Sequence, residues 1–207
     1  MPDNDCLQPD WEAVEPAYAS MADAARRLID AIVWTEVDAA TAATVTDALD
    51  SATARLRAHT MPQTFGLRRT LDGELVAWTN AVIGERNPIA PPIVIRSGAD
   101  SRVWADVELG AAYEGSTGLV HGGVCALILD HLLGSAARQS GQPAVTGTLT
   151  VRYVRPTRLG MLHAEAHVDR IDGAKMFVVG LISDRDNATT VQADGVFVIP
   201  KSATAAQ

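Results

Sequence analysis

The 207-residue chain has few cysteines and aromatic residues, no excess of positive charge and no long apolar run. Its two cysteines, Cys6 and Cys125, are too few for a scaffold held together by disulfides. The 25 acidic residues outnumber the 17 basic ones, and the net charge of −8 would repel a nucleic-acid backbone. No apolar stretch approaches the roughly 18 residues that a membrane-spanning helix needs. An aromatic content of 5% leaves the core to be packed from Ala, Val, Leu and Ile.

The beginning of the chain adds one further exclusion. Residues 1–20 are acidic and lack the charged-then-apolar pattern of a secretory signal. We therefore expect a cytoplasmic protein that binds neither nucleic acid nor membrane.

The first part of the chain has the hydrophobic spacing of helices. Apolar residues recur at helical intervals over residues 17–59, and the pattern breaks at residues 35–41. Thr35 and Asp38 are candidate N-caps for the second helix. We predict an N-terminal helical extension of two helices, residues 1–62.

After residue 62 the apolar period changes to two, which indicates β-strands. One long helix is expected at residues 120–138, closed by Gly141, between the first strong strand and four later ones. This order favours an α+β domain with one helix on an antiparallel sheet, and a partner should then bury the exposed sheet face or an edge. We assign residues 63–200 to this domain and residues 201–207 to a tail. The predicted strands cover residues 102–109, 145–154, 162–171, 175–183 and 190–199, with weaker signals at 75–82 and 92–96.

The start of the long helix carries the residues best suited to chemistry. His121-Gly122-Gly123 opens it, and the free N–H groups and the helix dipole there favour negative charge, such as the oxyanion of an attacked carbonyl. Asp130 lies in an otherwise apolar stretch, where burying a charge is costly unless it is compensated. Each feature alone is more often structural, but their combination indicates a catalytic site.

The spacing of these residues predicts a dimer. Gly123 and Asp130 are seven residues apart, on one helix face but about 10 Å apart along the axis. One carbonyl cannot be held by the first and attacked through the second within one chain. If both serve one reaction, the helices of two subunits run antiparallel and form two equivalent sites.

The pattern Tyr-x-Gly-x-x-Gly-x-Val-His-Gly-Gly-x-x-Ala-x-x-x-Asp at residues 113–130 resembles hotdog-fold acyl-CoA thioesterases. The similarity is to the branch of small phenylacetate-pathway and mammalian-type thioesterases. Residues 144–156 also resemble that family's strand ending in Tyr-x-x-Pro, and the likeness covers about residues 101–200. It implies a curved antiparallel sheet wrapped around one long helix, and dimers joined sheet edge to sheet edge that often pair into tetramers.

The resemblance also implies roles for individual residues. Asp130 acts as general base or nucleophile, and the N–H of Gly123 in the other subunit is the oxyanion donor. His121 shapes this turn, Gly122 belongs to the substrate-binding site, and Thr146 matches a Ser or Thr that helps to place the water. No metal or redox cofactor is expected.

One position departs from relatives, and one cluster of charge stands out. Several relatives carry an Asn six residues before the His, where this chain has Gly115. Arg152, Arg155 and Arg158 form the densest positive spot of an acidic chain. They fit either the phosphates of coenzyme A or ordinary surface charge, and we predict Arg155 and Arg158 as substrate-binding.

Several other residues favour structural interpretations. His131 is expected to be a satisfied structural or surface residue, and Cys125 a small buried apolar one. His163 and His167 share one strand face without a third metal ligand at the right spacing, which favours a solvated face. The segment from Asn87 resembles the hydratase motif of another hotdog branch, but the His and Asp of that motif are missing.

The sequence thus predicts an acyl-CoA thioesterase that works as a homodimer or a dimer of dimers. Two alternatives stay open. The first alternative is a non-catalytic acyl-CoA-binding protein, which would not need Asp130. The second is a thioesterase that acts on intermediates carried by acyl-carrier protein.

Overall fold

The computed structural model divides the chain into two compact units, Met1–Ile89 and Ala90–Gln207. We assigned residues 63–89 to the thioesterase domain, and those of them that the structure describes cluster with the first unit. The expected tail at residues 201–207 lies outside the described residues. The structure describes residues 11–61, 66, 68–69, 75–98, 100–142 and 144–200.

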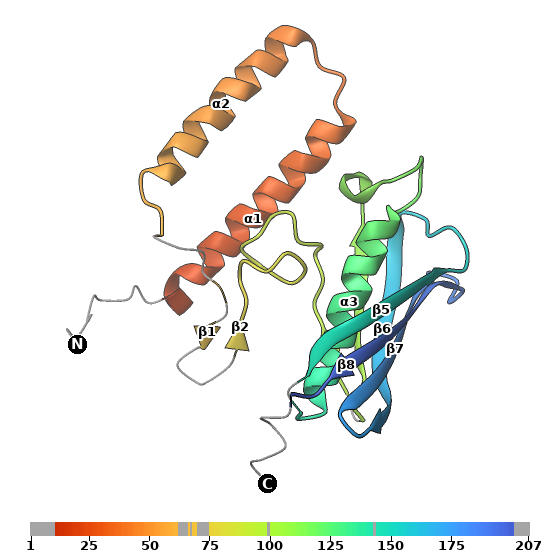
Figure 1. Ribbon diagram of the computed structural model, residues 1–207. Coiled ribbons are helices and arrows are strands. Elements are labelled where there is room, and N and C mark those ends of the chain that lie inside the picture. Colours follow the sequence, from red (N-terminus) through yellow and green to blue (C-terminus); the bar gives the residue numbers. More distant parts are fainter. Residues whose placement is uncertain are drawn as a thin grey trace, which may run out of the picture. The chain divides into compact units, whose positions relative to one another are not determined.

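The N-terminal unit contains the two predicted helices, α1 (Trp11–Trp34) and α2 (Ala39–Arg57) (Figure 1). Asp38 caps α2, because its carboxylate accepts a hydrogen bond from the backbone N–H of Thr41 at 2.8 Å. Thr35 lies before the cap, and its hydroxyl oxygen accepts from the N–H of Val37 at 3.4 Å. Two short strands, β1 (Arg68–Arg69) and β2 (Leu75–Val76), form an antiparallel pair in the same unit.

The two helices differ in how much they bury. Helix α1 buries Ala22, and its Arg26 donates a hydrogen bond to the carbonyl of Asn87 at 3.1 Å. The Arg86 guanidinium lies 3.5 Å from the centre of the Tyr18 ring, so residues 86 and 87 both contact α1. Helix α2 buries no side chain. Among the described residues, no helix is both long and apolar enough to cross a membrane.

The second unit is the predicted α+β domain. All strand pairs are antiparallel, and α3 (Gly122–Gln139) lies on one face of a sheet that curves around it (Figure 1). This arrangement confirms the hotdog architecture. The sheet order is β3 (Arg96–Ser97), β4 (Val103–Leu109), β6 (Gly160–Asp172), β7 (Lys175–Asp184), β8 (Thr189–Val198) and β5 (Val145–Tyr153).

The five strong strand predictions and the long helix are confirmed within two residues at each end. The weaker signals yield only β2 and β3. Helix α3 ends as predicted, because Gly141 has a φ of +77°, a left-handed conformation that glycine adopts without steric cost.

Helix α3 approaches the sheet closely where two glycines face it. A β-carbon added to Gly180 or to Gly195 would lie 2.7 Å from a methyl carbon of Leu133. Leu133 is fully buried, so the two glycines leave the space that this side chain fills. The same helix face buries Cys125, Ile128, Leu129, Leu132, Ala136 and Ala137.

Strand β5 forms one edge of the sheet. It pairs with β8 on one side, and its other side has no strand partner among the residues that the structure describes. Val145 and Tyr153, at its two ends, are 59% and 55% exposed. An open edge of this length offers a row of backbone groups to another strand.

Candidate active site

A closed loop brings the chain to the start of α3. The N–H of Gly115 donates to the carbonyl of Leu119 at 2.9 Å, and the N–H of His121 donates to the carbonyl of Tyr113 at 2.9 Å. The carboxylate of Glu114 accepts from the N–H of Gly118 at 2.6 Å. These bonds fix His121 at the N-terminus of the helix.

The side chain of His121 caps α3. Its Nδ1 accepts a hydrogen bond from the N–H of Gly123 at 3.0 Å. The Gly123 N–H, which we selected from the sequence as the oxyanion donor, is therefore engaged within the chain. The N–H of Gly122 has no hydrogen-bond partner within the described residues. The structure thus leaves Gly122 as the open donor of this turn.

The position where relatives carry an Asn has no room for a side chain. A β-carbon added to Gly115 would lie 2.8 Å from the Cα of His121 and 3.1 Å from its Cβ. Atoms at 2.8 Å overlap, and one of them is backbone, so no rotamer change relieves the contact. Gly115 is therefore the residue that this loop conformation requires.

Asp130 lies on α3 and is exposed in the single chain. The burial that we expected for its carboxylate is not present within one subunit. Gly122 and Asp130 are eight residues apart, about 12 Å along the helix at about 1.5 Å per residue. One chain therefore does not bring the open donor and the carboxylate to a single reacting atom.

His131, beside Asp130, is partly buried. Burial lowers the pKa of its imidazole, and the nearby Arg138 lowers it further, against the opposing charge of Asp130. Its Nε2 is buried without a hydrogen-bond partner in the described part of the chain, so the expected satisfied side chain is not observed. Cys125 is buried as expected, and burial raises the pKa of its thiol.

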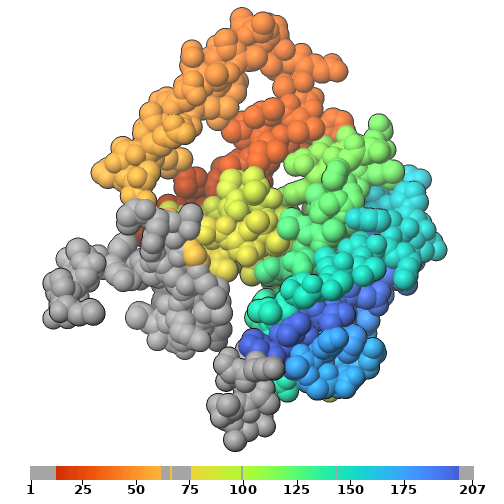
Figure 2. Space-filling view, in the orientation of Figure 1, coloured from red at the N-terminus to blue at the C-terminus, as the bar shows by residue number. Residues whose placement is uncertain are grey.

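The predicted arginines separate into two places. The segment after β5 lies against the loop before α3 (Figure 2). The N–H of Val120 donates to the carbonyl of Thr157 at 2.9 Å, and Leu119 and Arg158 form an isolated antiparallel β-bridge. Arg155 and Arg158 are exposed, and within the described residues neither forms an ion pair. Two of the three arginines therefore belong to a segment that borders the helix start.

Arg152 lies elsewhere, on the sheet face opposite α3. Its guanidinium donates to the side-chain oxygen of Gln192 at 3.3 Å. It borders a hollow of about 250 Å³ to which neither α3 nor the 113–121 loop contributes a lining residue. That hollow is lined by Arg152, Glu165, His167, Val179, Gly180, Leu181, Gln192, Ala193 and Asp194.

Thr146 lies on β5 beside an irregularity in its pairing with β8. It is exposed, and no hydrogen bond joins it to Asp130 in the part of the chain that the structure describes. Its role in placing water stays a prediction.

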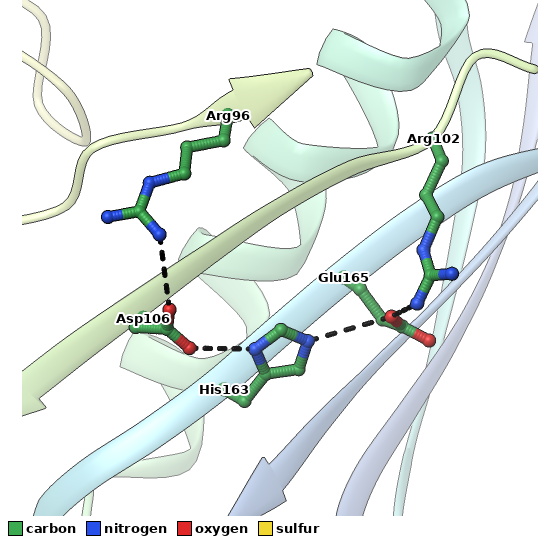
Figure 3. A network of polar contacts seen from close by, with 5 residues as sticks. All are labelled: Arg96, Arg102, Asp106, His163 and Glu165. Atoms are coloured by element: carbon green, nitrogen blue, oxygen red, sulfur yellow. Dashed lines mark hydrogen bonds and ion pairs between the residues drawn. The ribbon is translucent and has the colours of Figure 1, made fainter. Parts of the chain in front are cut away.

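His163 belongs to an ion network on the outer sheet face (Figure 3). Its Nδ1 lies 2.8 Å from a carboxylate oxygen of Asp106, and its Nε2 lies 3.6 Å from one of Glu165. Arg102 pairs with Glu165, and Arg96 lies 3.6 Å from Asp106. The sequence did not predict the contact with Asp106, because only the register between β4 and β6 places residue 106 beside residue 163.

Asn87 has a structural role in the N-terminal unit. Its side-chain amide donates to the carbonyls of Thr79 and Asn80 at 3.2 and 3.3 Å. Its side-chain oxygen accepts from the N–H of Ile89 at 3.2 Å. These bonds join residues 79–80 to residues 87–89.

A long helix on the inner face of a curved antiparallel sheet is the architecture of hotdog proteins. The sequence profile of the thioesterase superfamily matches residues 117–191. A crystal structure of a thioesterase superfamily protein is 36% identical, with a TM-score of 0.80, and the match covers 87% of this chain and 90% of that one. The chain belongs to the thioesterase superfamily.

Curated relatives match about half of this chain. "Acyl-coenzyme A thioesterase THEM4" of Rattus norvegicus is 30% identical over 102 residues, which is 48% of this chain and 44% of that protein. The protein of the same name from Bos taurus is 26% identical over 108 residues, 51% of this chain and 44% of that protein. The chain thus spans less than half the length of these relatives.

Proposed function

We propose that the chain hydrolyses acyl-CoA thioesters to a free carboxylic acid and coenzyme A. The observation that carries this proposal is the open N–H of Gly122 at the N-terminus of α3, with the carboxylate of Asp130 exposed on the same helix. Membership of the thioesterase superfamily and the names of the THEM4 relatives support the same reaction.

The chemistry follows from these two groups. The thioester carbonyl oxygen accepts a hydrogen bond from Gly122, where the helix dipole also favours its developing charge. Asp130 takes a proton from water as the water oxygen bonds to the carbonyl carbon. Collapse of the tetrahedral intermediate breaks the C–S bond, and the thiolate of coenzyme A leaves with the electron pair. The reaction uses no metal or redox cofactor.

Asp130 has a second route to the same products. Its carboxylate attacks the thioester directly, expels the thiolate and forms a mixed anhydride. Water then hydrolyses the anhydride and restores the carboxylate. Both routes need the same oxyanion donor.

The site is shared between two subunits in this proposal. The separation of about 12 Å along α3 requires Asp130 of one chain to meet Gly122 of another. The open edge of β5 is a suitable dimer interface, since antiparallel pairing with the same strand of a second copy would extend the sheet. We propose a homodimer, or a dimer of such dimers, on this basis.

The substrate's phosphates are proposed to dock on Arg155 and Arg158. Both are exposed and lie on the segment that borders the loop before α3. One guanidinium group can donate two parallel hydrogen bonds to a phosphate, so two arginines suit the diphosphate of coenzyme A. Arg152 is omitted from this role because it lies on the outer sheet face beside Gln192.

Thiol release from a panel of acyl-CoAs tests the activity. Asp130→Asn should lower the rate by about 10²- to 10⁴-fold, the usual contribution of a general base. Asp172→Asn, a change at an exposed carboxylate at the end of β6, is the matched control and should retain the wild-type rate. Equal rates for wild type and Asp130→Asn would refute the enzymatic proposal and favour a binding protein. Turnover of acyl-carrier-protein thioesters but not of acyl-CoA would refute the proposed substrate.

Complementation tests the shared site. Asp130→Asn and Gly122→Val each disable one half of it, so a heterodimer of the two retains one complete site. Random mixing in equal amounts should restore about a quarter of wild-type activity. Heterodimers that are shown to form but remain inactive would contradict the two-chain site.

A further inference from the structure

We propose that Tyr153 is a positioning residue that holds the first turn of α3, so that the N–H of Gly122 meets the thioester oxygen. The inference rests on the proposed function and adds a residue from outside the 113–130 motif. Tyr153 is the last residue of β5, 31 positions after Gly122.

The peptide unit between Gly122 and Gly123 is held at both ends. Its N–H donates to Nδ1 of His121 at 3.0 Å, and its carbonyl accepts from the hydroxyl of Tyr153 at 2.9 Å. Rotation of this peptide plane would break both bonds. His121 and Tyr153 thus fix a single plane from opposite edges.

The preceding peptide unit carries the open donor. Its carbonyl, that of His121, accepts from the N–H groups of Val124 at 2.9 Å and Cys125 at 3.3 Å. Its N–H is that of Gly122. With the neighbouring plane fixed by Tyr153 and this carbonyl fixed by the helix, the direction of the Gly122 N–H is set before substrate arrives, as an oxyanion donor requires.

The Tyr153 ring also lies directly against Gly122. A β-carbon at residue 122 would be 3.2 Å from Cε1 and Cζ of the ring and 3.3 Å from its oxygen. The absence of a side chain at residue 122 therefore lets the phenol reach the backbone. In the single chain Tyr153 is 55% exposed, so its hydroxyl is not placed by burial in the core of the subunit. Its hydrogen bond to Gly122 is the contact that tyrosine adds over phenylalanine.

Tyr153→Phe isolates this bond, because phenylalanine keeps the ring and removes the hydroxyl. We expect kcat to fall about tenfold with KM changed less than about twofold, since the donor acts mainly on the transition state. Tyr18→Phe is the matched control, because the Tyr18 ring stacks under Arg86 in the N-terminal unit and the change keeps that ring. Rates are referred to folded protein measured by circular dichroism. A kcat for Tyr153→Phe within about twofold of wild type would overturn the inference.

A double-mutant cycle tests whether His121 and Tyr153 hold one plane. His121→Asn keeps a capping side chain but changes its reach. If both residues fix the same peptide, the double variant loses less than the product of the two single losses. Losses that multiply would contradict a shared plane.

Hydrogen exchange separates this inference from the proposed function. In protein labelled with ¹⁵N-glycine, Tyr153→Phe should speed exchange of the Gly123 amide, because the peptide then loses the hydrogen bond that its carbonyl accepts from the hydroxyl. An unchanged rate would overturn the positioning role whether or not the protein is a thioesterase. Faster exchange in a protein without Asp130-dependent thiol release would instead refute the proposed function and leave the local role of Tyr153 in place.

Discussion

Replacing Gly115 by alanine tests how tightly the loop before α3 is built. The added β-carbon would lie 2.8 Å from the Cα of His121, 3.1 Å from its Cβ and 3.2 Å from its Cδ2. Gly115 does not have a positive φ, so alanine adds crowding without backbone strain. The loop must therefore shift, and His121 must move with it.

The size of the effect follows from the type of contact. Overpacking at a well-packed position usually costs about 1–3 kcal/mol. For a chain of this size, each kcal/mol lowers the melting temperature by about 2–4 °C, so Gly115→Ala should lower it by about 2–12 °C. Displacement of His121 should also release the Gly123 N–H that it caps at 3.0 Å. We expect a fall in kcat of about tenfold or more, because a shift of about 1 Å at a site is enough for such losses.

Thermal unfolding and thiol-release kinetics measure the two effects, with Gly118→Ala as the control. Gly118 has a φ of +73°, and a β-carbon there would meet no atom within 4 Å. Its replacement should cost about 1–2 kcal/mol through backbone strain, without pressing on His121. The reasoning is refuted if Gly115→Ala melts and turns over like wild type. It is also refuted if both variants lose kcat equally.

Two other predictions concern the sheet. Leu133→Ala should reduce the free energy of unfolding by about 2–5 kcal/mol, because Leu133 is fully buried against two glycines. Urea titrations measure this loss, and a value below about 1 kcal/mol would count against that packing. Burial raises the pKa of Glu165, but the hydrogen bond and charge of Arg102, with those of His163, outweigh it and hold the pKa below its ordinary value of 4.5. Wild type should therefore be more stable than Glu165→Gln above about pH 4.5 and lose this advantage as the pH falls through the lowered pKa. A difference in unfolding free energy that does not change with pH from about 3 to 7 would contradict the ion pair.

Local features of the chain could be predicted from sequence because their causes lie within a few residues. The Asp38 cap acts on Thr41, three positions away, and Gly141 ends α3 by its own backbone conformation. Alternation of period two located β4, β6 and β8, since each of these strands buries alternate residues in the core. The His121-Gly122-Gly123 motif located the start of α3, because His121 caps the helix that begins at the next residue.

The identity of the open donor could not be predicted in this way. Gly122 and Gly123 are equivalent in sequence, and the choice between them depends on the side chain of His121, which caps the second. Asp130 likewise belongs to an apolar stretch but is exposed, because burial depends on which helix face meets the sheet. Neither fact follows from spacing along one helix.

By itself, the sequence determined the α+β architecture, the places of the long helix and the five main strands, and the motif from residue 113 to residue 130. Tertiary structure alone decided that the hydroxyl of Tyr153 holds Gly122, that Asp106 lies beside His163, and that Gly180 and Gly195 make room for Leu133. The physical reason is the distance along the chain over which each interaction acts. Helix caps and hydrophobic period act between near neighbours, whereas these contacts join residues 31 to 62 positions apart, and only strand register and the approach of backbones bring them together.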